Sequence, residues 1–353
     1  MVADMDLSYT DEQQFLREAV RGTLDREAPL SKVREWVLEG DAEQEPALVM
    51  AARQGWTGIG VDEARGGQGG SLLELTVLAE ELGRAGVPAD PLYATLLGTV
   101  LLRSSDDPAA LALVEAAAEG EAVLALARTG GAPLDAGPAP DGPRTLVLGA
   151  PLARTFLDVR DGTVSTYDAA SATVTPHRLI DRTRCLGDVV LPAQAGGSFA
   201  GASPEQLTDL AAWGAVLVSA DALGACQRLL DLTVEYVGQR VQFGVAVGSF
   251  QAVKHAASEM LVAIEGTRAA IQYAAWAVGG DVAGASTDAW VAKSRAARMA
   301  VLVADKALFL HGAVGYTWEH DLQLLFKRAK SDAALLGGAS AYEDRIADAL
   351  ELV

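Results

Sequence analysis

The sequence predicts a mainly α-helical protein with a small β domain in its middle. Apolar residues recur at helical spacing near both ends of the chain, and the stretch between holds short β-branched runs bounded by Gly, Pro and Asp. This order predicts three parts: an N-terminal helical domain (1–120), a shortened middle β domain (121–200) and a C-terminal helical bundle (201–353).

The N-terminal domain is expected to begin with a helix over residues 7–27. Thr10 and Gln13 have the spacing of a capping box, in which two side chains satisfy free N–H groups of the first turn. Further helical patterns cover 33–37, 46–54 and 72–82. The glycine-rich stretch 58–70 lacks a following Lys-Ser/Thr and a clear preceding strand, so it is interpreted as a connection between helices rather than a phosphate loop.

The middle domain is predicted from five short apolar or β-branched runs. They lie at residues 123–127, 145–149, 155–159, 163–167 and 172–174. Residues 130–143, rich in Gly, Pro, Ala and Asp, are predicted to form a loop.

The C-terminal bundle begins with Ser203 as N-cap and Pro204 in the first helical position. Helical periodicity then continues to the end of the chain. Breaks are expected near residues 244–249, 279–286, 312–317 and 337–340. They predict four long helices and a short last one, arranged as an antiparallel four-helix bundle.

The composition excludes some classes of partner. A formal net charge of −19 repels phosphate backbones and anionic lipid, so neither nucleic acid nor a membrane surface is expected to bind. The longest apolar stretches, 91–102 and 210–220, are shorter than the roughly 20 residues that span a bilayer. Cys185 and Cys226 have no partner at a metal-ligand spacing, which favours reduced thiols in a cytoplasmic protein without a metal; a disulfide is the alternative.

Three segments resemble acyl-CoA dehydrogenases. Residues 240–251 contain Arg-x-x-Phe-Gly followed by Phe-Gln, and residues 311–330 contain His-Gly-Ala-Val-Gly-Tyr-Thr followed by Arg-Ala-Lys. Residues 10–13 and the run from Trp56 to Gly83 resemble the family's N-terminal domain. The matches cover most of the chain in the family's order, and the middle domain matches least.

The resemblance implies FAD as cofactor, with its ADP part held by residues that act on a flavin bound mainly in the neighbouring subunit. The implied positions are Arg240, Phe243, Gln251, Phe309, Leu310, His311, Gly312 and Ala313. Phe309 stands where the family usually has Gln, and Ala313 where it has a second Gly. Taken alone, Arg240 fits a surface salt bridge equally well, and His311 fits a packing role beside the site.

The resemblance implies no catalytic residue in this chain. The family removes the α-proton of an acyl-CoA with a Glu. The commonest position of that Glu corresponds to Leu335-Leu-Gly-Gly338 in this chain, and its second position corresponds to Gly214-Ala215, so neither position holds an acid. The nearest acids, Asp209, Asp221 and Asp332, are interpreted as structural. The family's loop at the flavin ring, Thr-Glu-Pro-x-x-Gly-Ser-Asp, would fall on residues 127–131. The charges Glu319, Asp321, Lys327 and Arg328 are expected to form a solvated or interhelical set.

These absences predict a heteromeric enzyme, similar to actinobacterial family members that pair one catalytic and one degenerate subunit. The implied partners are a homologous subunit in a heterotetramer, an acyl-CoA and an electron-transfer flavoprotein as acceptor; a homodimer or homotetramer stays open, and so does the acyl group, fatty or sterol-derived. Two alternatives remain: a catalytically silent homologue that stabilises a partner without flavin, and a homomeric flavoenzyme with a displaced base.

Overall fold

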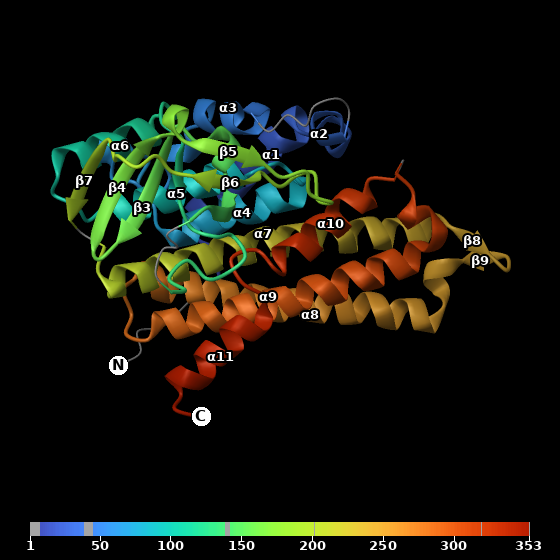
Figure 1. Cartoon of the computed structure of the whole chain (residues 1–353). Helices are drawn as coiled ribbons and strands as arrows, with labels where there is room; N and C mark the ends of the chain where they lie inside the picture. Colours follow the sequence, from blue (N-terminus) through green and yellow to red (C-terminus); the bar gives the residue numbers. More distant parts are fainter. Residues whose placement is uncertain (1–7, 39–44, 138–141, 201, 319, 353) are drawn as a thin grey trace.

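A computed structural model describes residues 8–38, 45–137, 142–200, 202–318 and 320–352. Helices form both ends of the chain, and the strands of the two main sheets lie between them, as the sequence predicts (Figure 1). Part of the predicted loop 130–143 lies outside the described residues.

The N-terminal helices follow the predicted patterns closely. They are α1 (Asp11–Glu27), α2 (Leu30–Leu38), α3 (Glu45–Arg53), α4 (Leu72–Ala85), α5 (Asp90–Leu102) and α6 (Pro108–Ala118). The capping box of Thr10 and Gln13 is present in both directions. The glycine-rich stretch forms two 3-10 turns, η1 (Trp56–Gly58) and η2 (Glu63–Arg65), and connects α3 to α4.

The middle domain has two small sheets. One has the order β1 (Leu124–Leu126), β3 (Thr155–Arg160), β4 (Thr163–Asp168), β7 (Gly197–Ala200), and the other β2 (Arg144–Leu148), β6 (Leu186–Val190), β5 (Thr173–Pro176). Only the β1 and β3 pair is parallel. The short turns η3 (Ala150–Leu152) and η4 (Ala169–Ser171) connect strands. The sequence did not predict β6 and β7, because Gly187, Asp188 and Gly197 interrupt their β-branched pattern.

The bundle consists of α7 (Pro204–Gln239), α8 (Gln251–Gly279), α9 (Ala285–His311) and α10 (Leu322–Asp332), and the short α11 (Ala339–Ala349) packs on α9. A small hairpin, β8 (Val241–Gln242) and β9 (Val245–Ala246), precedes η5 (Val247–Ser249) between α7 and α8. The fourth helix, α10, is only 11 residues long, shorter than the breaks predict. The turn η6 (Gly312–Tyr316) falls on the break predicted at 312–317, because Gly312 with φ 63° ends α9.

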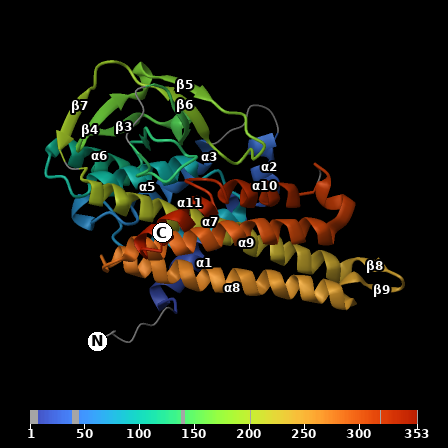
Figure 2. The same ribbon diagram turned by 60° about the horizontal axis from the view of Figure 1, so that its bottom comes forward.

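Figures 1 and 2 show the β8–β9 hairpin at the far end of the bundle from β4 and β7. Two segments, Pro204–Gln239 and Ala285–Tyr316, are long and apolar enough to cross a membrane by length and composition alone. In the first, 94% of the apolar window is buried inside the protein, and in the second 44%. Burial of the first identifies it as the core helix of the bundle.

Helices α4 and α7 cross with their backbones in direct contact. A Cβ on Gly224 would lie 1.8 Å from Glu80 O, and one on Gly83 would lie 2.0 Å from Asp221 O. A larger residue at either glycine therefore forces the two helices apart.

Gly224→Ala is expected to lower the free energy of unfolding by about 3 kcal/mol, since the added methyl group overpacks a rigid crossing. Gly238→Ala, on the same helix with open space around its Cβ, is the matched control and is expected to be neutral or slightly stabilising. Urea unfolding followed by circular dichroism measures both. Equal midpoints would show that the helices do not touch at Gly224.

Candidate functional site

The far end of the bundle exposes an unusual number of large apolar side chains. Phe243 and Phe309 are 93% and 80% exposed, and Tyr316 and Trp318 are also exposed. Phe243 has a φ of 53°, so the hairpin turn holds its ring outward at a conformational cost. Large apolar groups gathered at one end of a bundle indicate a surface that another molecule covers.

Arg240 caps the C-terminus of α7 at the base of the hairpin. Its guanidinium lies 5.8 Å from the centroid of the Tyr236 ring, one turn earlier. Among the described residues it makes no ion pair, so the salt-bridge interpretation of Arg240 does not hold. The exposed cation is available to an anionic ligand.

His311 lies below this surface. Its ring stacks on Tyr236 with a centroid distance of 4.5 Å, and its Nδ1 donates to Ala307 O at 2.8 Å. His320 packs edge-on against it at 5.2 Å. Burial is the main cause that lowers the pKa of His311, so the ring is neutral at pH 7.

The other positions implied by the resemblance gather at the same end. Gln251 begins α8 next to Phe250, which packs edge-on against Phe243 at 6.4 Å. Gly312 has open space where a Cβ would lie, so backbone there allows close approach. Of the eight implied residues, Leu310 and His311 are directed inward and the others are exposed. An exposed arginine, two outward phenylalanines and open glycine backbone fit the pyrophosphate and adenosine of a dinucleotide.

The two places where a catalytic base was expected meet in the structure. A Cβ on Gly214 would lie 3.0 Å from Leu336 Cδ1 and 3.1 Å from Leu134 Cδ1. Leu336, Leu134 and the neighbouring Leu97 are all buried. Leucine side chains therefore fill the space where the two expected base positions meet. We call this set of leucines with Gly214 the closed centre.

Hydrogen bonds fix the backbone of Leu336, one of the leucines of the closed centre. Leu336 N donates to Gly130 O at 2.7 Å, which joins the segment expected to carry the base directly to the segment expected at the flavin ring. Tyr342 of α11 donates to Leu336 O at 2.6 Å, and Arg345 pairs with Asp135 at 2.7 Å. Beside this contact lies a cavity of about 440 Å³ with Gly131, Ile180, Lys327 and Leu335 in its wall.

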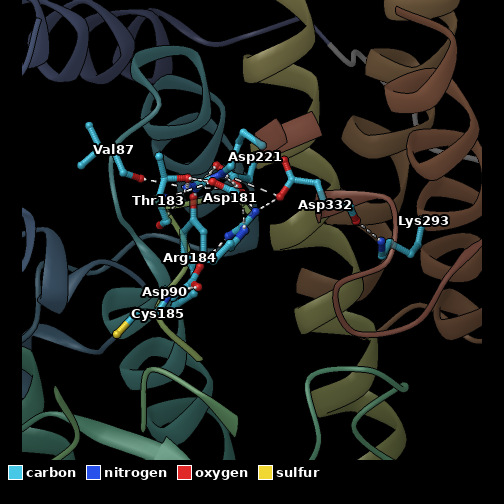
Figure 3. Close-up of polar contacts among 11 residues, drawn as sticks. Val87, Asp90, Asp181, Thr183, Arg184, Cys185, Asp221, Lys293 and Asp332 are labelled. Atoms are coloured by element: carbon cyan, nitrogen blue, oxygen red, sulfur yellow. Dashed lines mark hydrogen bonds and ion pairs between the residues drawn. The ribbon is translucent and has the colours of Figure 1, made fainter. Parts of the chain in front are cut away.

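A buried ion network joins the three parts of the chain (Figure 3). Asp221 of α7 binds Arg328 of α10 through two hydrogen bonds of 2.9 Å and binds Arg184 of the middle domain through a third. Arg184 also contacts Asp90 of α5 at 2.5 Å and pairs with Asp332 of α10. All five side chains are fully buried.

Two further groups complete the network. Lys293 of α9 donates to Asp332 O at 2.7 Å, and burial is the first cause that lowers the pKa of its amine to about 7. Arg328 donates to Thr183 Oγ1 at 2.8 Å. The charge set is expected to be solvated or interhelical, and Arg328 is interhelical: it is fully buried and pairs with Asp221 of α7. Asp321 pairs with Arg34, and Glu319 lies outside the described residues. The sequence does place Arg328 and Asp332 on the same face of α10 as the apolar Leu325, and this spacing could have indicated that the two charges are buried.

Asp221 and Asp332 are therefore structural acids, each held by arginine. Asp209 lies 3.4 Å from Arg103, and burial raises its pKa. Cys185 and Cys226 are free and buried, and burial raises the pKa of both thiols. Within the described ranges no cluster of His, Cys, Asp and Glu could hold a metal.

The chain belongs to the acyl-CoA dehydrogenase family, whose members are FAD-dependent oxidoreductases. The family's C-terminal domain matches residues 206–350, and its N-terminal domain matches residues 10–121. The middle domain, which carries the least resemblance, lies between the two matches.

Particular relatives extend over nearly the whole chain. Acyl-CoA dehydrogenase IpdE2 of Mycolicibacterium smegmatis is 32% identical over 93% of this chain and 95% of its own length. Acyl-CoA dehydrogenase FadE34 of Mycobacterium tuberculosis is 33% identical over 97% of this chain but only 48% of its own length. The ChsE4-ChsE5 complex from Mycobacterium tuberculosis has a chain that is 26% identical with a TM-score of 0.86, covering 99% of this chain and 100% of that one.

Proposed function

We propose that this chain is the subunit of a FAD-dependent acyl-CoA dehydrogenase that lacks a base, and that its exposed bundle end completes the flavin site of a homologous partner subunit. The partner supplies the catalytic glutamate. The complex dehydrogenates an acyl-CoA thioester to the 2-enoyl-CoA. When bound, FAD supplies the hydride acceptor for that reaction, and an electron-transfer flavoprotein is the proposed acceptor of its electrons.

The observation that carries this proposal is the contrast between the exposed bundle end and the closed centre. Six of the eight residues implied for a neighbour's FAD are exposed, and Arg240 among them makes no ion pair with a described residue, whereas leucines surround Gly214 in the chain's own centre. A chain that formed its own active site would need a carboxylate in that centre. The 26% identical ChsE4-ChsE5 structure is described as a complex, and FadE34 is about twice as long as the stretch it shares with this chain. Both support a working unit larger than one such chain.

The role proposed for this chain's residues is binding and orientation. Arg240 pairs with the pyrophosphate, Phe243 and Phe309 cover the adenosine, and the Gly312 backbone allows close approach. The substrate class is an acyl-CoA, and a steroid-derived acyl group is favoured because a 25% identical structure with a TM-score of 0.86 is described as a steroid acyl-CoA dehydrogenase. The proposed location is the cytoplasm.

A second function fits the closed centre equally well: a silent homologue that stabilises a partner without binding flavin. The two differ only in what the exposed bundle end does. In the silent homologue, Arg240 would contact protein rather than a cofactor.

Co-expression with a family member encoded beside this chain tests the proposal. The chain alone is expected to be colourless, and the complex is expected to show flavin absorbance and to form enoyl-CoA. Arg240→Ala in the complex is expected to lower FAD affinity at least tenfold, since a charge-assisted hydrogen bond contributes about 1.5–3 kcal/mol.

Arg298→Ala is the matched control, because Arg298 also lies on the bundle but pairs with Glu343 away from the hairpin. It is expected to leave FAD affinity unchanged. A complex that assembles without flavin would favour the silent homologue. A chain that binds flavin and forms enoyl-CoA by itself would refute the proposal that a partner subunit supplies the catalytic glutamate.

A further inference from the structure

Two polar atoms beneath the exposed bundle end have no hydrogen-bond partner among the described residues. They are Tyr236 Oη and His311 Nε2, which belong to the stacked pair of rings below Arg240. Both atoms are shielded from solvent, so bulk water does not satisfy them in the isolated chain. Buried polar atoms in folded proteins are nearly always hydrogen-bonded, so the missing partners require an explanation.

The chemistry of His311 defines what its partner must be. Ala307 O only accepts hydrogen bonds, so Nδ1 carries the ring proton. The lowered pKa leaves the ring neutral at pH 7, so Nε2 is a bare acceptor. The missing partner of His311 is therefore a donor such as a hydroxyl. Tyr236 Oη can either donate or accept, and a hydroxyl group satisfies it as well.

The place of these atoms indicates where the hydroxyl comes from. Tyr236 lies one helical turn before Arg240, and His311 directly precedes Gly312 at the end of α9. His311 is buried while Phe309, two residues earlier on the opposite side of the helix, is exposed. The stacked pair therefore lies directly beneath the surface proposed for the ADP part of FAD.

We propose that Tyr236 Oη and His311 Nε2 hydrogen-bond a ribose hydroxyl at the ADP end of the FAD held mainly by the partner. The inference rests on the proposed function. Because both atoms are shielded, it requires residues 312–316, four of which are exposed in the isolated chain, to move when the cofactor binds. The isolated chain leaves the two atoms unsatisfied, and cofactor binding removes that cost.

Flavin titrations of the co-purified complex, stripped of its cofactor, test this. Tyr236→Phe keeps the ring stack and removes only Oη, and His311→Asn keeps a group near Nδ1 and removes Nε2. Each is expected to weaken FAD binding roughly threefold to tenfold, the effect of one hydrogen bond. Neither is expected to change the binding of FMN, which has no ADP end. His311→Gln, which retains a polar group near the Nε2 position, is expected to lose less FAD affinity than His311→Asn.

The unfolding midpoint of the isolated chain is the second measurement. Tyr236→Phe removes an unsatisfied buried hydroxyl, so the midpoint is expected to stay the same or rise while FAD affinity in the complex falls. If Tyr236 only packs, Tyr236→Phe would leave FAD affinity unchanged, which overturns the inference. If Arg240→Ala weakens FAD binding but Tyr236→Phe and His311→Asn do not, only this inference fails. A wild-type complex without flavin overturns the proposed function as well.

Discussion

Replacing Asp221 with alanine is expected to remove most of the stability of the chain. Asp221 accepts hydrogen bonds from Arg184, Arg328 and Tyr93, and every one of these side chains is buried. Without the carboxylate, two guanidinium groups lose their central counter-charge in a site that water does not reach. Breaking a buried ion pair in this way costs about 3–5 kcal/mol, and a typical protein has only about 5–15 kcal/mol in total.

The measurement is urea unfolding of the purified chain, or its soluble yield if Asp221→Ala does not accumulate. Asp305→Ala is the matched control: Asp305 pairs with Lys330 at 2.6 Å but is 58% exposed. An exposed ion pair contributes less than about 1 kcal/mol, so the control is expected to unfold close to the wild type. Similar midpoints for the two variants would contradict the central role given to Asp221.

Leu336→Glu is expected to destabilise the chain rather than to create an active dehydrogenase. The new carboxyl would be buried against Leu97, Leu134 and Gly214, with no cation in that group to pair with it. Burying an unpaired charge costs several kcal/mol, and the group responds by raising its pKa. A carboxyl at this position is useful only where a substrate and a flavin surround it.

The size of this effect depends on pH, and Leu336→Gln provides the neutral control of the same length. Since the folded-state pKa of the new Glu is raised above its unfolded value near 4.3, the folded state binds the proton more tightly. Its stability relative to Leu336→Gln is therefore expected to be higher at pH 5 and to fall as pH rises toward 8. Urea midpoints at both pH values measure it. A soluble Leu336→Glu chain that forms enoyl-CoA alone would show that the closed centre opens.

Local features of the fold could be predicted from the sequence, and long-range ones could not. The capping box at Thr10 and the N-cap at Ser203 depend on residues at most three positions apart, and both are present. The residues expected at the cofactor surface could be chosen because they fall in short motifs. Their common position at one bundle end then follows from antiparallel helices.

The ion network shows the limit of prediction from spacing alone. Arg184 and Asp90 are 94 residues apart, and Arg328 and Asp221 are 107 apart. Within α10, Arg328 and Asp332 have the spacing of an ordinary surface pair, and only the packing of α10 on α7 buries them. The closed centre likewise depends on segments distant in sequence meeting, although the sequence does predict that the two expected base positions lack an acid.

The aromatic end of the bundle has a consequence for how the cell must produce this protein. A surface that carries Phe243, Phe309, Tyr316 and Trp318 in the open is a site of self-association until a partner covers it. Surplus copies are therefore exposed to aggregation and to quality-control proteases. We expect synthesis of the two subunits to be matched in amount and closely timed, so that the supply of the partner sets how much of this chain survives.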